Sequence, residues 1–234
     1  MNFQKYVFSE PYFHWLLRGA VMTLAIAALT SVLALAVGIA VGMLRASNKT
    51  LLRGAGFIYV LVFRNLPLLP FLLFLTFALP DITQLAFGMT FPRGTEFVLL
   101  ICGISLNTAG YIAEIFRSGM KAISQEQYYA GRVLGLRPRT IYWRILFPQS
   151  LRIAFPALGS RLMHNMKNSS IALVLPLSVD HAEIMGQAAR IAGQTFAWAE
   201  PLIFAACVYL CLAFAISLGI RRLNKINTLR IEGS

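Results

Sequence analysis

Charged residues are scarce in this sequence, and acidic residues are the scarcest of them. Asp, Glu, Lys and Arg make up 13% of the 234 residues, about half of the ~25% that is typical of soluble domains, whereas 58% of the residues are apolar. This composition argues against a water-soluble globule. It also excludes a disordered or collagen-like chain, because the sequence is too apolar to stay solvated and has no glycine period. What remains is a protein embedded in a membrane.

The sequence also lacks the motifs of metal sites and of catalysis. Its three cysteines, Cys102, Cys207 and Cys211, lie inside apolar stretches without a CxxC pair or a His/Cys ligand spacing, so we expect small buried apolar residues rather than a disulfide or metal framework. No Gly-x-x-x-x-Gly-Lys-(Ser/Thr) phosphate loop is present, and no nucleophile, base and orienting group occur together. The sequence therefore predicts a chain that is not an enzyme, with no catalytic residue, no metal ligand and no bound cofactor.

Long uncharged runs, in contrast, are abundant. The run over 19–44 has 26 residues, more than the ~20 needed to cross a bilayer and too many for the ~7–15-residue apolar core of a secretory signal. Four further apolar regions follow, at 57–79, 97–113, 153–179 and 201–220. Two of these regions contain cations: Arg64 lies in 57–79, and Arg161 and Lys167 lie in 153–179. The sequence predicts an all-α integral membrane protein with five transmembrane helices.

The first of these runs contains two glycines one helical turn apart. Gly38 and Gly42 share a face of the predicted helix, and small residues at this spacing let two membrane helices approach closely. We expect a packing role for them and no contact with a ligand.

The basic residues are distributed unevenly over the segments between these spans. Fourteen follow spans one, three and five, namely Arg45, Lys49, Arg53, Arg117, Lys121, Arg132, Arg137, Arg139, Arg144, Arg152, Arg221, Arg222, Lys225 and Arg230. The opposite side has Lys5, Arg18, Arg93 and Arg190. The positive-inside rule then predicts an N-terminus outside and a C-terminus in the cytoplasm. The net charge of +12 is explained by topology and does not indicate a nucleic-acid partner.

An outer segment between spans four and five has helical periodicity. Ile184, Ala188, Ile191 and Thr195 recur at the spacing of one helical face within 181–198. We expect a helix that lies at the membrane surface, with a helix that caps a pathway as the alternative.

The segment over 117–152 is basic and only half apolar. A helical run over 126–134 is followed by Gly135 and then Pro138, as is typical of a helix end, and a second helix is predicted over 139–147 with Pro148 ending it. Two short helices around a glycine turn would form a compact knob below the membrane. Its candidate contact residues are Tyr128, Tyr129, Val133, Leu136 and Trp143.

This segment resembles the coupling loop of importer-type ATP-binding cassette (ABC) permeases. The pattern of that loop is Glu-Ala-Ala, three residues, Gly, nine residues, Ile, any residue, Leu, Pro. The corresponding residues here are Tyr129, Ala130, Gly131, Gly135, Ile145, Leu146, Phe147 and Pro148, and Gln127, Arg132, Leu134 and Gln149 match the usual flanks. At Tyr129 the family has an acid that is expected to meet a basic residue of the ATPase, and Glu126, one turn earlier, is an alternative partner for that residue.

Three further motifs are similar to those of the polar amino acid permeases, so the resemblance covers most of the chain. Phe63-Arg64-Asn65-Leu66-Pro67-Leu68-Leu69 resembles Phe-Arg-(Asn/Gly)-x-Pro-Leu, and Ala113-Glu114-Ile115-Phe116-Arg117-Ser118-Gly119 resembles Ala-Glu-Ile-x-Arg-x-Gly. Lys167-Asn168-Ser169-Ser170-Ile171-Ala172 matches the Lys-x-(Ser/Thr)-Ser segment and is especially similar to one subunit of glutamate/aspartate importers.

The resemblance implies a single type-1 transmembrane domain over 1–234, with its coupling loop at about 117–152, in the bacterial inner membrane. The expected partners are a cytoplasmic ATPase dimer that binds ATP and Mg²⁺, a second permease that is different or, as the alternative, identical, and an extracytoplasmic solute-binding protein. The expected substrate is glutamate or aspartate, with glutamine and basic or neutral amino acids as alternatives. The residues implied in ATPase coupling are Gln127, Tyr129, Ala130, Gly131, Arg132, Leu134, Gly135, Ile145 and Pro148.

Charges inside the spans are candidate substrate contacts, because an isolated Lys or Arg at mid-bilayer costs ~2.5–3.5 kcal/mol. Lys167 lies ~22 Å along a helix from Arg152, where it would meet a substrate carboxylate or, alternatively, form an ion pair with Glu114 or bind a backbone carbonyl. Arg64 is the second candidate, with a helix-end or snorkelling role as its alternative, and Arg161 is expected to snorkel. The predicted pathway residues are Arg64, Asn65, Glu114, Lys167, Asn168, Ser169 and Ser170.

Two alternatives come from other classes of membrane protein. One is an ion-coupled secondary transporter subunit that uses Glu114 and Lys167 as an ion relay. The other is a membrane assembly subunit without a transport site.

Overall fold

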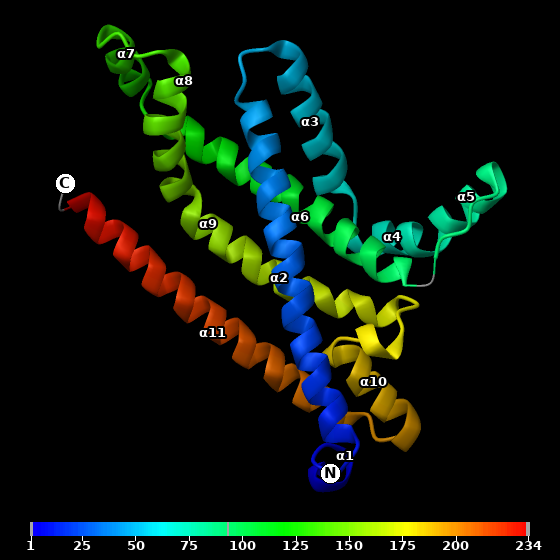
Figure 1. The fold of residues 1–234 in the computed structure, drawn as a ribbon. Helices are drawn as coiled ribbons and strands as arrows, with labels where there is room; N and C mark the ends of the chain where they lie inside the picture. The colour runs from blue at the N-terminus through cyan, green and yellow to red at the C-terminus, as the bar shows by residue number, and fades with distance from the viewer. Residues whose placement is uncertain (1, 93, 233–234) are drawn as a thin grey trace. The chain divides into compact units, whose positions relative to one another are not determined.

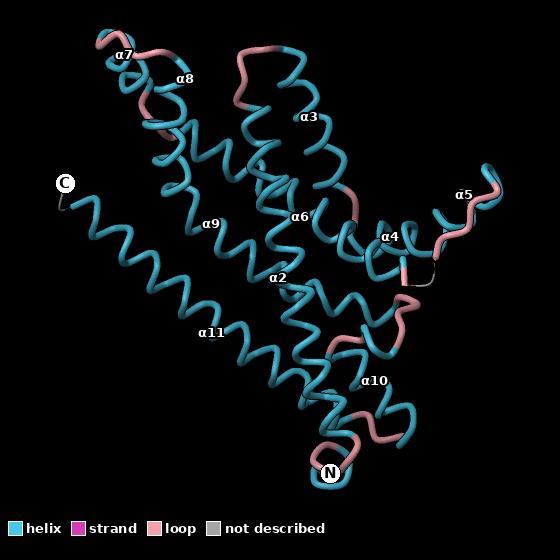
Figure 2. Tube along the Cα trace, viewed as in Figure 1, coloured by secondary structure: helices cyan, strands magenta, loops and turns pink. Residues whose placement is uncertain are grey.

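The structure is a computed structural model that describes residues 2–92 and 94–232, with side chains described as far as Asn224. Arg93, which the charge argument assigned to the outer side, and the side chains of Lys225 and Arg230 lie outside the described residues. Every regular element in these ranges is a helix (Figures 1 and 2), which confirms the predicted all-α class.

The long helices are α2 (Tyr12–Arg45), α6 (Thr95–Lys121), α9 (Phe147–Asn168) and α11 (Ala199–Glu232), labelled in Figure 1. Shorter α-helices are α1 (Phe3–Tyr6), α3 (Thr50–Asn65), α4 (Leu68–Leu73), α5 (Leu79–Phe87), α7 (Gln125–Val133), α8 (Pro138–Ile141) and α10 (Ile184–Thr195). Two π-helical turns, η1 (Phe74–Ala78) and η2 (Tyr142–Leu146), and two 3₁₀ segments, η3 (Ser169–Val174) and η4 (Val179–His181), complete the chain.

Four helical stretches of the described chain are long and apolar enough to cross a membrane. They are Tyr12–Arg45, Leu68–Phe87, Thr95–Lys121 and Ala199–Asn224. Three of them contain the predicted spans at 19–44, 97–113 and 201–220. The predicted span at 153–179 is not among the four, because α9 includes three cations and ends at Asn168, where the chain changes to a 3₁₀ segment.

The predicted span at 57–79 is wrong as a continuous helix. α3 ends at Asn65, Pro67 is extended with φ −60° and ψ 128°, and α4 begins at Leu68. Proline has no backbone N–H and disfavours a helical conformation in the residue before it, so the break falls at Leu66 and Pro67. The stretch that could cross a membrane therefore starts later than predicted, after this break.

Each π-helical turn ends two residues before a proline. η1 precedes Pro80 and η2 precedes Pro148, and in η2 the Phe147 N–H donates to the Tyr142 carbonyl five residues back. The wider turn accommodates a residue that cannot donate a helical hydrogen bond and whose ring would clash with a carbonyl of the preceding turn. The helix therefore continues through Pro148 into α9, and the prediction that Pro148 ends it is wrong.

The chain divides into two compact units, and the four longest helices contribute residues to both. Unit 1 comprises Met1–Leu33, Leu66–Leu106 and Met163–Ile216, and unit 2 comprises Ala34–Asn65, Asn107–Leu162 and Ser217–Ser234. In unit 1, Ile184, Ala188 and Ile191 of α10 are fully buried in one cluster with Leu16 of α2 and Ala205 of α11. This packing confirms the helix predicted within 181–198 and shows that its apolar face contacts protein.

In unit 2, α2 packs closely against α6 through two glycines. A Cβ atom on Gly38 would lie 2.6 Å from Ile112 Cβ and 2.9 Å from the Ala109 carbonyl oxygen, and one on Gly42 would lie 2.9 Å from Phe116 Cδ1. No side chain fits at these positions while the helices stay this close, which confirms the predicted packing role.

The predicted burial of the cysteines is wrong. Cys102 on α6 and Cys207 and Cys211 on α11 are all exposed on the isolated chain, as free thiols. These helices are apolar enough to cross a membrane, and a thiol is a small, weakly polar group that suits apolar surroundings.

The close helix contact predicts that Gly38→Ala destabilises the protein by about 1–3 kcal/mol, because the new methyl group overlaps α6. Gly54→Ala is the matched control, since a Cβ at Gly54 of α3 meets nothing within 4 Å. There the same change should stabilise the helix by roughly 0.5–1 kcal/mol. Thermal unfolding of the two variants in detergent checks both signs, and equal effects would refute the proposed packing role of Gly38.

Candidate functional site

The first candidate site is the loop formed by α7 and α8 in unit 2. Ser124 caps α7, because its hydroxyl accepts the Glu126 N–H at 3.2 Å. At the other end Gly135 has φ +75°, its N–H donates to the Arg132 carbonyl, and the Leu136 N–H donates to the Gly131 carbonyl, both at 3.0 Å. This double bond pattern is a Schellman motif, which needs a left-handed residue at the position of Gly135. The predicted glycine turn is confirmed.

Gly131 is the buried point of the loop. A Cβ atom there would lie 2.9 Å from Ile141 Cγ1, so glycine allows α7 to close against α8. The other implied coupling residues lie around it: Gln127, Ala130, Arg132, Leu134, Gly135 and Pro148 are exposed or half-buried, and Ile145 is half-buried.

The surface of this loop is unusually apolar for a polar, basic segment. Tyr129 is 61% exposed, Val133 87%, Leu134 78% and Trp143 52%. Of the other two predicted contact residues, Leu136 is half-buried and Tyr128 packs against neighbouring rings. Exposed apolar side chains gathered on one small element typically mark a surface that binds another protein.

Aromatic rings connect this loop to α6. Tyr128 of α7 lies edge-on to Tyr142 of η2 at 6.1 Å between ring centroids. Trp143 of η2 contacts Phe147 at 5.2 Å, and Phe147 contacts Phe116 of α6 at 5.6 Å. The loop is therefore packed onto the end of α6 by ring contacts worth roughly 0.5–1.5 kcal/mol each beyond their buried area.

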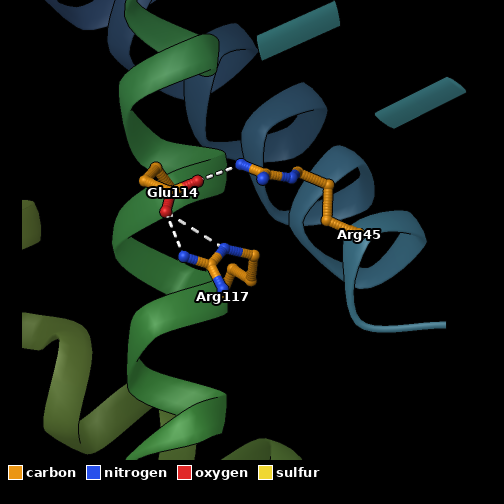
Figure 3. A network of polar contacts seen from close by, with 3 residues as sticks. All are labelled: Arg45, Glu114 and Arg117. Carbon is orange, nitrogen blue, oxygen red and sulfur yellow. Dashed lines mark hydrogen bonds and ion pairs between the residues drawn. The ribbon is translucent and has the colours of Figure 1, made fainter. Parts of the chain in front are cut away.

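An ion cluster joins α2 to α6 in the same unit (Figure 3). The Glu114 carboxylate forms ion pairs with Arg45 and with Arg117, and the Arg117 Nε–H donates to Oε1 at 3.0 Å. All three side chains are no more than 24% exposed. Glu114 is thus bound by two guanidinium groups of unit 2, which replaces the predicted alternative of an ion pair with Lys167.

The predicted pathway residue Arg64 lies beside a tyrosine at the end of α3. The Arg64 guanidinium is 6.0 Å from the centroid of the Tyr111 ring, and the Tyr111 hydroxyl donates to the Arg64 carbonyl at 3.1 Å. Asn65, also predicted, donates from its side-chain amide to the Leu61 carbonyl at 2.8 Å. The Asn107 amide donates to the Phe63 carbonyl at 2.7 Å. These bonds satisfy backbone carbonyls at the break between α3 and α4.

Arg161 reaches the same tyrosine, and its predicted snorkelling is wrong. Its guanidinium lies 3.7 Å from the Tyr111 centroid, and its Nη2 atom donates to Asn107 Oδ1 at 3.4 Å. The Nε atom of Arg161 is buried and has no hydrogen-bond partner among the described residues. Tyr111 therefore contacts two cations, one of which has a free, buried donor.

The motif that begins at Lys167 lies in unit 1, where α9 changes to the 3₁₀ segment η3. Lys167 is exposed, and Asn168 is half-buried at the last position of α9. Ser169 is fully buried and donates to the Met166 carbonyl at 2.7 Å, and Ser170 donates to the Lys167 carbonyl at 2.9 Å. The four predicted residues form one polar bend.

A buried carboxylate near this bend was missed in the sequence. Glu183 is fully buried in unit 1 and caps α10, where its oxygens accept the Met185 and Gly186 N–H groups, each at 2.9 Å. It also accepts the Tyr209 hydroxyl at 2.6 Å, and that hydroxyl lies 3.2 Å from Ser169 Oγ. Burial raises the pKa of Glu183 above its ordinary value of 4.5, and these hydrogen bonds oppose the rise.

The local signals for these missed residues were weak but present. Glu183 directly precedes a helical run, as N-capping residues do, and Tyr111 follows Asn107 by one helical turn within an apolar stretch of its helix. The sequence placed Glu183 only within the outer segment 181–198 and gave no reason to pair Tyr111 with Arg161, 50 residues apart.

These features define a class of protein: a helical membrane protein with polar clusters among its helices and a compact, apolar-surfaced loop between two of its long helices. A comparison with protein families identifies the family within that class. Residues 34–226 match the model of the binding-protein-dependent transport system inner membrane component. The match covers most of the chain, and the protein belongs to this family.

Named relatives are amino acid permeases. The chain is 29% identical to the arginine transport system permease protein ArgU of Corynebacterium glutamicum over 88% of this chain and 66% of that protein, just under two thirds of its length. It is 32% identical to the "Probable amino-acid ABC transporter permease protein YckA" of Bacillus subtilis, over 84% of this chain and 82% of that protein. The nopaline transport system permease protein NocM of Agrobacterium fabrum is 29% identical over 86% and 83%.

Solved structures agree in fold. The crystal structure of an amino acid ABC transporter with histidines superposes with a TM-score of 0.79 at 26% identity, over 92% of this chain and 94% of that chain. The MetNI methionine ABC transporter has a TM-score of 0.73 at 20% identity, over 94% and 99%, which is a likeness of fold alone.

The chain is therefore the permease subunit of an ABC amino acid importer, a non-catalytic, multi-pass component of the inner membrane. The family resemblance found in the motifs is confirmed. The two alternatives from other classes, an ion-coupled transporter and an assembly subunit, give way to this assignment.

The raised pKa of Glu183 predicts a pH-dependent stability difference against Glu183→Gln, which keeps the shape and removes the charge. As the pH rises above about 4.5, the unfolded carboxyl ionises before the folded one, so the wild-type protein loses stability relative to the variant. Thermal unfolding in detergent across this pH range measures the difference. Asp81→Asn, at an exposed carboxylate, is the control. A stability difference between the wild type and Glu183→Gln that does not change with pH would contradict the raised pKa of Glu183.

Proposed function

We propose that this permease conducts amino acids with a second carboxylate, glutamate or aspartate, and that Arg161 binds a substrate carboxylate. The supporting observation is the buried Nε–H of Arg161, a donor without a partner among the described residues. A guanidinium keeps its charge in a protein, and a buried donor left unbonded costs ~1–3 kcal/mol. A carboxylate is the ligand that such a group binds best, by charge-assisted hydrogen bonds.

Tyr111 and Arg64 complete the proposed contact. Tyr111 supports the Arg161 guanidinium through its ring face and orients the Arg64 backbone through its hydroxyl. A second cation at the break between α3 and α4 adds positive potential without adding a fixed carboxylate. An excess of cations favours substrates that have more carboxylates than amines, which is the chemical reason for preferring the acidic amino acids.

Lys167 is proposed as a further contact on the pathway, with Asn168, Ser169 and Ser170 as neutral hydrogen-bonding groups. Its exposed ammonium stands at a bend where helical hydrogen bonding changes, and irregular backbone at membrane depth is tolerated where it lines a water-filled path. Relatives are named for arginine, glutamine and nopaline transport, so the family includes proteins with other substrates. Glutamine and basic or neutral amino acids are therefore the alternatives.

We further propose five membrane crossings in a single transmembrane domain over 1–234, with the N-terminus outside and the C-terminus in the cytoplasm. The four apolar stretches support four of the crossings, and α9 supplies the fifth, with its cations on the pathway. The basic residues after α2 and between α6 and α9 support the orientation.

The apolar loop is proposed as the docking surface for a cytoplasmic ATPase dimer that binds ATP and Mg²⁺. Glutamine, arginine and small residues surround its exposed apolar side chains, and the aromatic contacts link it to the end of α6. The family's description implies a binding protein on the other side, and a second, different permease would complete the pathway. Glu126, in the first turn of α7, is proposed to replace the acid that is missing at Tyr129.

Removing the Arg161 donor should raise the KM for glutamate and aspartate. Arg161→Gln deletes a charge-assisted hydrogen bond, so we expect the KM to increase about 10–100-fold. The KM is measured from substrate-stimulated ATPase activity of the reconstituted transporter. Arg152→Gln, an exposed arginine on the same helix, is the matched control and should leave the KM unchanged. Lys167→Met tests the second proposed contact in the same assay. If arginine or glutamine selectively stimulates the ATPase activity of the wild type, the proposed preference for acidic amino acids is wrong.

Placing a charge on the docking surface should separate ATPase binding from folding. Val133→Asp lies on the 87% exposed position of the loop, and we expect roughly tenfold weaker retention of the ATPase subunits on purification. Leu51→Asp, on an 85% exposed residue of α3, is the control for an added charge of the same kind. Equal retention of the ATPase subunits by the two variants would show that the loop is not the docking surface.

A further inference from the structure

A polar cavity in unit 2 is lined by none of the residues of the proposed substrate contact. It has a volume of about 1090 Å³ and lies among the end of α2, the start of α3, the end of α6, the start of α7 and η2. Four of its lining residues are cations, Arg45, Arg53, Arg117 and Lys121, and none is acidic. The cavity therefore has the charge of an anion-binding site.

The positive charge of this cavity is only partly compensated. Glu114 pairs with both Arg45 and Arg117, so one carboxylate balances two guanidinium groups (Figure 3). Arg53 and Lys121 are exposed and form no ion pair within the described part of the chain. Uncompensated cations around a concave site raise the local concentration of anions.

An apolar hollow adjoins the cationic cavity. It has a volume of about 370 Å³, and Ser47, Met120 and Tyr142 are among the residues that line both. Its remaining lining consists of three apolar side chains and one cation, Met43, Trp143, Phe147 and Lys49. A soluble anion gains nothing from such a surface, whereas an amphiphile with an anionic head and a hydrocarbon chain can occupy both hollows at once.

The depth of the two hollows suits a membrane lipid. α2 and α6 are both apolar enough to cross a bilayer, and they end at Arg45 and Lys121, beside the cavity. The ends of spanning helices lie at the level of the lipid headgroups, and Trp and Tyr are enriched there. Basic pockets between helices at this level bind anionic headgroups.

We propose that the cationic cavity binds the phosphate of an anionic phospholipid and that the adjoining hollow holds part of an acyl chain. The site joins α2, α3, α6 and the start of the α7–α8 loop, so a bound lipid would contact the elements that meet at this end of unit 2. An acidic surface of the ATPase is the competing occupant, because Trp143 lies both on the proposed docking surface and in the lining of the apolar hollow. The proposal does not depend on the substrate or on Arg161.

Native mass spectrometry of the transporter purified with its partner subunits tests the site. The complex is titrated with phosphatidylglycerol or with phosphatidylcholine, and we expect the anionic lipid to be retained preferentially. The double variant Arg53→Gln/Lys121→Gln should weaken phosphatidylglycerol binding roughly thirtyfold, since two cations near the headgroup are lost. Arg221→Gln/Arg222→Gln, on α11 and outside the cavity, removes the same charge and should bind as the wild type does.

Three results would overturn the proposal. Equal retention of the two lipids, or equal loss in both double variants, would show that no specific anionic site exists. Complete displacement of phosphatidylglycerol by millimolar inorganic phosphate would identify a soluble anion as the ligand. Loss of the ATPase subunits from Arg53→Gln/Lys121→Gln with lipid binding unchanged would identify the cavity as a protein-docking surface. Because binding is measured without transport, failure here leaves the proposed substrate untouched.

Discussion

The close contact between α2 and α6 in unit 2 positions the ion cluster and the cationic cavity at the ends of these two helices. Gly38 and Gly42 remove two side chains from the interface, and the helices approach until Ile112 and Phe116 fill the space. Arg45 lies one turn beyond Gly42, so this approach is what brings its guanidinium to Glu114. The ion cluster and the cationic cavity both depend on a packing contact that contains no charge.

The α7–α8 loop is tied to the same helices by packing. Its own geometry is set by Gly135, whose left-handed conformation closes α7, and by Gly131, which admits Ile141. Its position is set by Phe147 against Phe116. A displacement of the loop therefore strains aromatic contacts at the end of α6, where Arg117 holds Glu114. This arrangement is suited to passing a movement of a docked partner into the membrane helices.

The sequence was sufficient for features that depend on one or two neighbouring residues. It predicted the helical class, the glycine turn at Gly135 and the close packing at Gly38, because each follows from backbone rules or from local motifs. The family was also recognisable, since its motifs are contiguous. Segment boundaries were less accurate: the break moved the second apolar stretch from 57–79 to Leu68–Phe87.

Contacts between distant segments could not be predicted. Arg161 was expected to extend toward water, yet Tyr111 offers its ring and Asn107 its amide oxygen. Glu183 was assigned only to the outer segment 181–198, yet it is buried, where Tyr209 and two backbone N–H groups donate hydrogen bonds to its carboxylate. A hydropathy pattern treats each charged residue alone, as exposed or as costly to bury. It does not include the hydrogen-bond and ring partners that distant segments bring to that residue when the chain folds.

The π-helical turns also fix the angular register of the helices that come after them. Each adds one residue to a turn, and one residue corresponds to about 100° of rotation around a helix axis. The side chains of α9 are thus rotated by this amount relative to α8 compared with an uninterrupted α-helix. A proline near the start of α9, more than a dozen residues before Arg161, therefore sets which face of α9 is directed toward α6 and α2. The same rotation determines which cation lies beside Tyr111.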